Sequence, residues 1–376
     1  MSVKPQTAAI HIPHRRRDGA MAPPIHLATT YEHSPSNELL FEHDYIRGGN
    51  PNVNDLELRL AALETGAKRV DALTFASGMA AGAALLETIE PGSTVIFHHE
   101  LYFAFKRLAD VALPARNISA KFINLKDEAA FEAAIDKNTA LIWFETPSNP
   151  QLELLNIDLI VARAKSIGAK TVIDGTFATP ALQHPFEFDV DYIIHSMTKF
   201  MGGHSDVQGG ALVIRDDEEM HLRIKDLRGL HGYVLAPFNA WLIARGLQSL
   251  HCRMRAHSEH AFDVAMALEG HKNVARVNYP FLESNSDFAI AKKQMSAGGG
   301  ILSFLVKGDR ATTLDVASKV KLFVNATSVG GVESLIEHRK SVEGDWTSTP
   351  DTLLRLSVGL EHPKDLIDDL FTALDF

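Results

Sequence analysis

The stretch K-T-V-I-D-G-T-F-A-T-P-A-L-Q-H-P-F-E-F-D-V-D-Y-I-I-H-S-M-T-K-F, residues 170–200, indicates the fold. It contains two short β-rich runs, at 170–174 and 192–195. Apolar runs this short are typical of strands buried inside a parallel sheet. Asp174 ends the first run and Lys199 follows the second. Because α/β folds bind ligands at the carboxyl edge of such a sheet, we expect a site between these side chains.

The same alternation continues on both sides of this stretch. Further β-rich runs lie at 93–98, 121–124 and 139–145, and helical patterns lie at 79–89, 128–135 and 158–167. This order predicts an α/β fold with a mostly parallel central sheet that is covered by helices on both faces. A long helical zone follows, and strands and helices then alternate again in a smaller C-terminal α+β unit. The predicted organisation is an irregular arm over 1–50, a large domain over 51–245 and a small domain over 246–376.

Composition limits the partners and the compartment. The chain has 376 residues, 45% hydrophobic and 22% charged, with a net charge of −10, which disfavours binding to nucleic acid or to anionic membranes. A single cysteine, Cys252, fits a reducing compartment, so we expect a cytoplasmic protein. No apolar run is long enough for a secretion signal or a membrane span. The pairs His98–His99 and His195 with His204 lack a recognised zinc spacing, and Asp206 more simply orders its loop, so no metal is predicted.

A helix start and a lysine form a candidate cofactor site. In T-F-A-S-G-M, residues 74–79, a β-rich run ends at Ser-Gly and a helix begins, so free backbone N–H groups would face an anion. Such a turn can also do no more than cap its helix. Lys199 lies close to the hydroxyls of Ser196 and Thr198, in a segment without a helix face that would carry it to solvent. The residues alone leave open a reactive amine or a salt-bridged lysine.

Two further charged residues, Asp174 and Arg355, each have two interpretations. Asp174 fits a carboxylate that faces a ligand, and it also fits a turn or capping aspartate. Arg355 lies in the apolar run L-L-R-L-S-V and needs an anionic partner. That partner is either a substrate carboxylate or a side chain in a structural salt bridge.

Ordered blocks over nearly the whole chain resemble the pyridoxal 5′-phosphate (PLP) enzymes of Cys/Met metabolism, which include cystathionine γ-synthase, cystathionine β- and γ-lyases, methionine γ-lyase and the homoserine-ester sulfhydrylases. The matching blocks are Y-I-R-G-G-N-P at 45–51, S-G-M at 77–79, E-T-P-S-N-P at 145–150, D-G-T-F-A-T-P at 174–180, H-S-M-T-K-F at 195–200, G-H-S-D at 203–206, A-K-K-Q-M at 291–295, S-V-G-G-V-E-S-L-I at 328–336 and R-L-S-V-G-L-E at 355–361. The resemblance implies the fold-type I architecture of PLP-dependent transferases.

The resemblance also implies a role for each matching side chain. Lys199 would hold PLP as a Schiff base and then move protons, Asp174 would face the pyridine nitrogen, and Tyr102 would stack on the ring. The remaining cofactor-binding residues would be Gly78, Met79, Thr176, Ser196 and Thr198. The substrate carboxylate would be bound by Arg355, with help from Asn149 and Ser328.

Tyr45 and Arg47 match residues that reach the cofactor phosphate of a neighbouring subunit. The resemblance therefore implies a homo-oligomer, a tetramer built as a dimer of dimers with shared active sites. In that assembly the proline-rich arm would pack on the neighbouring copy.

The chain departs from the family pattern close to the cofactor. Gly175 stands where an asparagine usually follows the aspartate, so another group must fill that space. Phe103, Ala104 and Phe105 replace the small residues that usually follow Tyr102, and their bulk could close part of the site.

Two other departures bear on the substrate. Thr327 stands where γ-lyases tend to carry a glutamate, so a carboxylate for a distal ammonium is absent there. H-R-K-S-V-E-G, residues 338–344, replaces the usual His-Pro-x-x-Met-Thr-His and brings Arg339 and Lys340 near the expected pocket mouth. This departure favours a substrate with a more anionic tail.

The sequence thus favours a PLP-dependent carbon–sulfur lyase or γ-replacement enzyme that acts on sulfur amino acids. A cystathionine γ-lyase or γ-synthase fits, and a methionine γ-lyase or an O-acylhomoserine sulfhydrylase is an alternative. A catalytically silent PLP- or amino-acid-binding protein of the same fold is a further alternative. The choice between β- and γ-chemistry stays open. A nicotinamide-dependent dehydrogenase is disfavoured, because no G-x-G-x-x-G follows the first strand.

Overall fold

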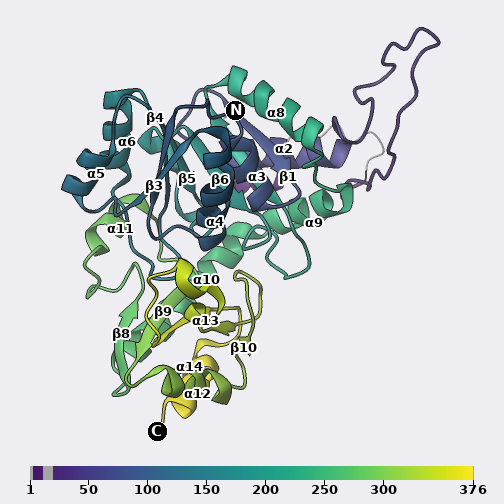
Figure 1. The fold of residues 1–376 in the computed structure, drawn as a ribbon. Helices are drawn as coiled ribbons and strands as arrows, with labels where there is room; N and C mark the ends of the chain where they lie inside the picture. The colour runs from purple at the N-terminus through teal and green to yellow at the C-terminus, as the bar shows by residue number, and fades with distance from the viewer. Residues whose placement is uncertain (1–2, 12–19, 376) are drawn as a thin grey trace.

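The computed structural model describes residues 3–11 and 20–375 and contains two sheets (Figure 1). The larger sheet has seven strands in the order β1-β7-β6-β5-β4-β2-β3. Their bounds are Val70–Phe75 (β1), Thr94–His98 (β2), Ser119–Ile123 (β3), Thr139–Glu145 (β4), Lys170–Asp174 (β5), Tyr192–Ser196 (β6) and Gly210–Arg215 (β7). β7 is antiparallel to β1 and β6, and the other neighbouring pairs are parallel. The predicted mostly parallel sheet is confirmed.

Apolar cores cover both faces of this sheet, because side chains alternate along each buried strand. In β4, Leu141 and Trp143 lie in one core, whereas Ile142 and Phe144 lie in the other. The surrounding helices are Pro51–Leu63 (α2), Gly78–Leu86 (α3), Phe103–Ala112 (α4), Glu128–Ala134 (α5), Ile157–Ile167 (α6), Thr179–Leu182 (α7), Glu218–His231 (α8) and Pro237–Leu247 (α9). This layering buries the strands and leaves their carboxyl ends as the place for a site.

The smaller sheet has five strands in the order β10-β11-β12-β9-β8. Their bounds are Val274–Asn278 (β8), Ile301–Val306 (β9), Val324–Asn325 (β10), Leu335–Glu337 (β11) and Leu353–Ser357 (β12). The helices of this region are Leu250–Glu269 (α10), Phe288–Gln294 (α11), Arg310–Lys319 (α12), Arg339–Glu343 (α13) and Pro363–Leu374 (α14). α10 joins two cores, since Leu250 packs in the large-sheet core and Leu268 in the small-sheet core. The domain division at 245 and 246 stays a prediction.

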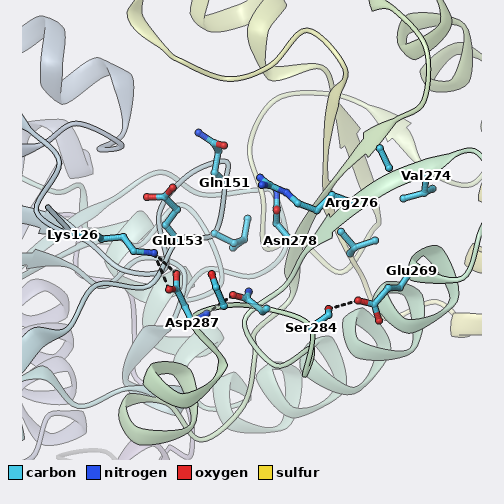
Figure 2. A pocket seen from close by; sticks show the side chains of 14 residues that line it. Lys126, Gln151, Glu153, Glu269, Val274, Arg276, Asn278, Ser284 and Asp287 are labelled. Atoms are coloured by element: carbon cyan, nitrogen blue, oxygen red, sulfur yellow. Dashed lines mark hydrogen bonds and ion pairs between the residues drawn. The ribbon is translucent and has the colours of Figure 1, made fainter.

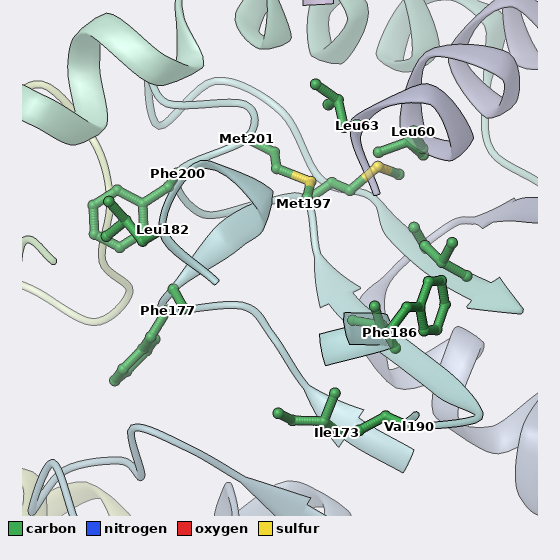
Figure 3. Close-up of a cluster of buried hydrophobic side chains, with 14 of the residues drawn as sticks. Leu60, Leu63, Ile173, Phe177, Leu182, Phe186, Val190, Met197, Phe200 and Met201 are labelled. Atoms are coloured by element: carbon green, nitrogen blue, oxygen red, sulfur yellow. The ribbon is translucent and has the colours of Figure 1, made fainter. Parts of the chain in front are cut away.

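The loop after β6 is fixed by its own apolar residues. Met197, Phe200 and Met201 are buried in the core that also holds Leu60 and Leu63 of α2 (Figure 3). With these three side chains directed into the core, the polar residues between them face the other way. The segment therefore presents its hydroxyls and its lysine on a rigid support.

The predicted N-terminal arm is partly ordered on its own chain. It begins with a short helix, Pro5–Ile10 (α1), whose Ala8 and Ala9 are buried against α2. Residues 12–19 of the arm lie outside the described residues. The rest is irregular, and its purple ribbon extends away from the body of the molecule (Figure 1). In the described ranges, 3–11 and 20–375, no helix is long and apolar enough to cross a bilayer.

Candidate active site

A cavity of about 380 Å³ lies at the carboxyl ends of β4, β5 and β6. The predicted site residues that line it are Gly78, Met79, Tyr102, Asn149, Asp174, Thr176, Ser196, Thr198, Lys199, Ser328 and Arg355. They come from both sheets and from positions almost 280 residues apart, so only the fold brings them together. The cavity lies at the predicted sheet edge, with Asp174 and Lys199 both on its wall.

Lys199 is held inside the cavity by one hydrogen bond. Its Nζ donates to Ser328 Oγ at 2.7 Å. Burial lowers the pKa of Lys199 to about 8, and the positive charges of Arg355 and Arg339 act in the same direction. An appreciable share of the amine is therefore neutral near neutral pH, as a nucleophile or a proton carrier requires.

Arg355 has the predicted neighbours and one that the sequence did not reveal. Its Nη1 donates to Asn149 Oδ1 at 2.9 Å, and its Nη2 donates to the carbonyl of Ser328 at 3.1 Å. Nη2 also forms an ion pair with Glu337 Oε2 at 2.6 Å. Glu337 lies opposite Arg355 in the register of β11 and β12. Both interpretations of Arg355 therefore apply. The guanidinium has a structural partner in Glu337, and it also lines the cavity, where it can meet a substrate carboxylate.

Asp174 is a buried carboxylate held by Thr176. The backbone N–H of Thr176 donates to Asp174 Oδ1 at 3.0 Å, and Thr176 Oγ1 accepts from the Ser196 N–H at 2.8 Å. Burial raises the pKa of Asp174, while hydrogen bonds from Thr176 and the positive charge of Lys199 oppose the rise. Thr176, predicted to bind cofactor, therefore also fixes the strand end that carries the aspartate.

His195 fills the space beside Gly175. A Cβ atom added at Gly175 would lie 2.8 Å from Cε1 of His195 and 3.1 Å from Cγ2 of Ile193. The His195 ring is buried and its Nε2 lies 3.2 Å from Glu64 Oε1. The ring therefore fills the space beside Gly175 as a structural group, and the missing side chain leaves no void.

The start of α3 forms a cradle for an anion. Ser77 caps the helix by accepting from the Ala80 N–H at 3.1 Å, and the first N–H groups of a helix have no partner within it. A Cβ atom at Gly78 would lie 3.1 Å from Cβ of Ser196, so a side chain there would crowd the cradle. Thr198 Oγ1 accepts from the Gly209 N–H at 3.1 Å, which orders the loop after β6.

The two phenylalanines after Tyr102 have different positions. Phe105 is buried against Trp143, with ring centroids 4.7 Å apart, and occupies space left free by Gly82. Phe103 contacts the Tyr102 ring edge-on, with centroids 5.2 Å apart and planes at 72°. Phe105 is therefore anchored in the core and also lines the cavity, and Phe103 lines the cavity beside Tyr102.

Comparison with known proteins agrees with this geometry. The family described as Cys/Met metabolism PLP-dependent enzyme matches the chain over residues 6–375. The chain belongs to this family. Its relatives include cystathionine gamma-synthase of Mycobacterium tuberculosis, 41% identical over 98% of this chain and 96% of the relative, and cystathionine beta-lyase of Coxiella burnetii, 38% identical over 95% and 93%. A crystal structure of cystathionine gamma synthase from Xanthomonas oryzae pv. oryzae has a TM-score of 0.94 at 34% identity and covers 100% of this chain and 98% of its own.

These findings confirm the predicted family, the fold-type I architecture and the PLP dependence that the family description states. The residues of the cavity fit PLP. An amine of lowered pKa and a buried carboxylate line the same cavity, and the glycine-bearing helix start can receive a phosphate. Which atoms of this member of the family hold the cofactor stays a prediction.

Glu145 is a cavity residue that sequence reasoning missed. It ends β4 just as Asp174 ends β5, and the two residues are register partners. Its Oε2 accepts from the Tyr102 N–H at 2.9 Å. Burial, together with the negative charge of Asp174, raises the pKa of Glu145 well above its ordinary value. The carboxyl group thus positions Tyr102 and retains its proton to higher pH than a free glutamate.

We expect Glu145→Gln to stabilise the fold at alkaline pH. Above the ordinary pKa of 4.5 the unfolded chain loses this proton, whereas the folded chain keeps it up to the raised pKa, so Glu145 lowers stability as the pH rises between these values. Glutamine does not ionise and still accepts from Tyr102. The unfolding temperature should rise by about 1–3 °C near pH 8 and by less near pH 5 in thermal unfolding. An equal shift at both pH values would contradict this origin.

Tyr45 and Arg47 lie outside the cavity of their own chain. Arg47 Nη1 donates to the carbonyl of Gly229 at 3.1 Å, and its guanidinium lies 5.8 Å from the Tyr45 ring centroid. Both residues line a separate groove with Leu222 and Leu230 of α8. Their predicted role in a neighbouring subunit stays a prediction.

A second polar cavity, of about 360 Å³, contains none of the predicted site residues. Lys126 and Asp287 form an ion pair of 2.7 Å on one side of it. Figure 2 shows this pair, with Arg276 and Asn278 on another side of the cavity. Among the residues described, no group of three or more His, Cys, Asp or Glu side chains is arranged to hold a metal ion. The predicted site residues other than Tyr45 and Arg47 line the cavity at the sheet edge.

Proposed function

We propose that the chain is a PLP-dependent carbon–sulfur lyase or γ-replacement enzyme that acts on sulfur amino acids or homoserine esters. The observation that carries the proposal is one cavity lined by Lys199, Asp174 and Arg355. An amine of lowered pKa, a buried carboxylate and a guanidinium are the groups that PLP chemistry on an amino acid requires. Relatives named cystathionine gamma-synthase, beta-lyase and gamma-lyase support this reaction class.

Lys199 would move the protons of the reaction. When bound, PLP supplies an electron sink for negative charge at the substrate Cα. Lys199 Nζ would take the Cα proton and return a proton at Cβ, Cγ or the leaving group, and its pKa near 8 suits both directions. Its hydrogen bond to Ser328 holds the amine on the side of the cavity where Arg355 lies.

Arg355 would bind the substrate α-carboxylate and so orient the Cα–H bond toward the amine. A guanidinium suits this role because two parallel N–H groups match a carboxylate. Asn149 and Glu337 hold the guanidinium plane in position through hydrogen bonds of 2.9 and 2.6 Å. The Arg355 side chain has therefore already lost its rotational freedom before the substrate binds, so binding costs less conformational entropy.

The other predicted residues would hold the cofactor. Asp174 would face the ring nitrogen and keep it protonated, and Tyr102 would lie against the ring. The backbone N–H groups of Gly78 and Met79 and the hydroxyls of Ser196 and Thr198 would bind the phosphate. Thr198 and Thr176 would order the loop and the strand end beneath it.

A homo-oligomer with shared sites would complete the cavity. Support comes from the described part of the arm, where Leu27 and Phe41 are 71% and 62% exposed. Apolar side chains exposed this far, on an arm that stands away from the body, need a surface to cover them (Figure 1). A second copy would supply that surface and receive Tyr45 and Arg47 at its own cavity. We propose a tetramer built as a dimer of dimers.

A product survey tests the proposed reaction. The holoenzyme is incubated with cystathionine, cysteine, methionine, homocysteine or an O-acylhomoserine plus cysteine, and ammonia, sulfide, thiols, keto acids and cystathionine are measured. Pyruvate from cystathionine indicates β-cleavage, 2-oxobutyrate indicates γ-cleavage, and cystathionine from the ester indicates γ-replacement. An absorbance change with amino acids but no product would favour the silent binding protein instead.

A further inference from the structure

Arg339 is a charged side chain of the cavity that the proposed reaction does not use. It begins α13, is buried, and lines the cavity together with Val342 of the same short helix. Nη1 donates to Glu337 Oε2 at 2.7 Å and Nε donates to Glu343 Oε1 at 3.0 Å, while Nη2 contacts Glu343 as well. Because a guanidinium carries five N–H donors and these bonds use three, two donors remain for a ligand.

Phe103 and Arg339 form one feature of the cavity wall. The Arg339 guanidinium lies 5.9 Å from the centroid of the Phe103 ring, in cation–π geometry. Both residues belong to segments that depart from the family pattern, 103–105 and 338–344, and the fold brings these two departures into contact. Phe103 in turn contacts Tyr102, which would lie against the cofactor. Arg339 therefore lies against Phe103, next to Tyr102 on the cavity wall, and it shares the Glu337 carboxylate with Arg355.

Among the cationic side chains near the cavity, Arg339 is the one available to bind the far end of a substrate side chain. Glu337 and Glu343, which neutralise the guanidinium, are not among the lining residues, so the cavity meets the cation and not its partners. Arg355 is assigned to the α-carboxylate. Lys340, which the sequence also suggested for the pocket mouth, instead donates to the carbonyls of Gly344 at 2.9 Å and Thr347 at 3.2 Å.

We propose that Arg339 determines specificity by binding a carboxylate at the far end of the substrate side chain. This inference rests on the proposed function and specifies its substrate class as amino acids whose side chain ends in a carboxylate. The guanidinium, held at its edge by two glutamates and at its face by Phe103, is positioned to bind a carboxylate in a fixed orientation. Substrates with a short, uncharged tail leave it without a partner.

The first test compares two esters with the same reacting bond. O-succinyl-L-homoserine has the terminal carboxylate, and O-acetyl-L-homoserine lacks it. The wild-type holoenzyme should have the higher kcat/KM with the succinyl ester. Arg339→Gln should lower the ratio of the two kcat/KM values about 10- to 100-fold, the range expected for a lost hydrogen bond to a charged group. Lys340→Gln, a neighbouring change outside the cavity, should leave the ratio unaltered.

The ratio separates recognition from a structural role. If Arg339 only supports Arg355 or α13, its loss lowers both kcat/KM values by the same factor. That outcome overturns the proposal. A wild-type preference for the acetyl ester overturns it as well. Because Arg339→Gln leaves Glu343 buried without its partner, the double variant Arg339→Gln/Glu343→Gln is made in parallel. The same fall in the ratio is expected there.

A binding measurement keeps this inference separate from the proposed function. L-2-aminoadipate and L-norleucine have equal carbon chains and differ in the terminal carboxylate, and neither has a leaving group. Calorimetry should find tighter binding of L-2-aminoadipate to the wild-type holoenzyme and no such preference in Arg339→Gln. If no substrate in the survey is turned over, the proposed function fails while this comparison still decides the role of Arg339. Equal binding of both probes to the wild type would overturn it.

Discussion

Lys199→Ala is expected to lower turnover by at least about a thousandfold and to abolish the covalent attachment of PLP. Lys199 is the lysine that lines the cavity, and alanine provides neither an amine for the cofactor nor a group that moves protons. Turnover is measured with the best substrate of the product survey. Attachment is measured by reducing the holoenzyme with borohydride, which makes the bond between PLP and the lysine permanent. The masses of its proteolytic peptides are then determined by mass spectrometry. In the wild type, the peptide with residue 199 should gain the mass of the cofactor.

Lys106→Ala is the matched control. Lys106 also has a pKa lowered by burial, but its Nζ donates to the carbonyl of His99 at 2.9 Å and it does not line the cavity. Its loss should leave turnover within a few-fold of the wild type and should not affect the labelled peptide. A Lys199→Ala protein that keeps both turnover and attachment would refute the assignment of this lysine.

Lys199→Ala also tests whether neighbouring subunits share an active site. If Arg47 acts in the cavity of a neighbouring subunit, Arg47→Ala impairs the neighbouring subunit's site. Lys199→Ala disables the site of the subunit that carries it. Mixed oligomers of the two variants would then contain some cavities with both residues intact. When the two variants are unfolded and refolded together, activity should rise above the level that either variant reaches when it is refolded alone. No recovery in oligomers shown to be mixed would place Arg47 outside the neighbouring site.

The sheet and its functional edge could be predicted because they depend on local sequence. The runs 139–145 and 170–174 match β4 and β5 to the residue, since each is a short apolar run that stops at an acidic side chain. Parallel strands bring such ends to the same edge, which placed Asp174 near the loop that carries Lys199. The run 139–145 also stops at an acidic residue, so Glu145 was predictable at the same edge.

The charged cluster around Arg339 could not be predicted, because it depends on pairing between distant segments. β11 has three residues, too few for a periodic signal, and the Glu337–Arg355 pair exists only because β11 lies beside β12. Whether a buried arginine meets a protein carboxylate or a ligand is likewise decided by packing. His195 shows the same limit, since its partner Glu64 lies 131 residues away.

Asp174→Asn is expected to lower kcat about 100- to 10,000-fold while the cofactor stays attached to Lys199. Asparagine still accepts the hydrogen bond from the Thr176 N–H, so the strand end should keep its geometry. It carries no negative charge, however, and therefore cannot hold a proton on the ring nitrogen. Asp191→Asn is the matched control, because Asp191 pairs with Lys170 at 3.1 Å and accepts from Thr171 outside the cavity. That variant should keep kcat within a few-fold of the wild type.

The charge on the ring nitrogen can be supplied independently of the protein. A PLP analogue methylated at that nitrogen has a permanent positive charge and does not depend on Asp174 for it. Reconstituting Asp174→Asn with this analogue should recover part of the lost kcat, whereas the wild type should gain nothing from it. If the analogue restores nothing although it binds, the carboxylate acts by a route other than protonation of the ring. If Asp174→Asn with ordinary PLP retains wild-type kcat, Asp174 has no catalytic role.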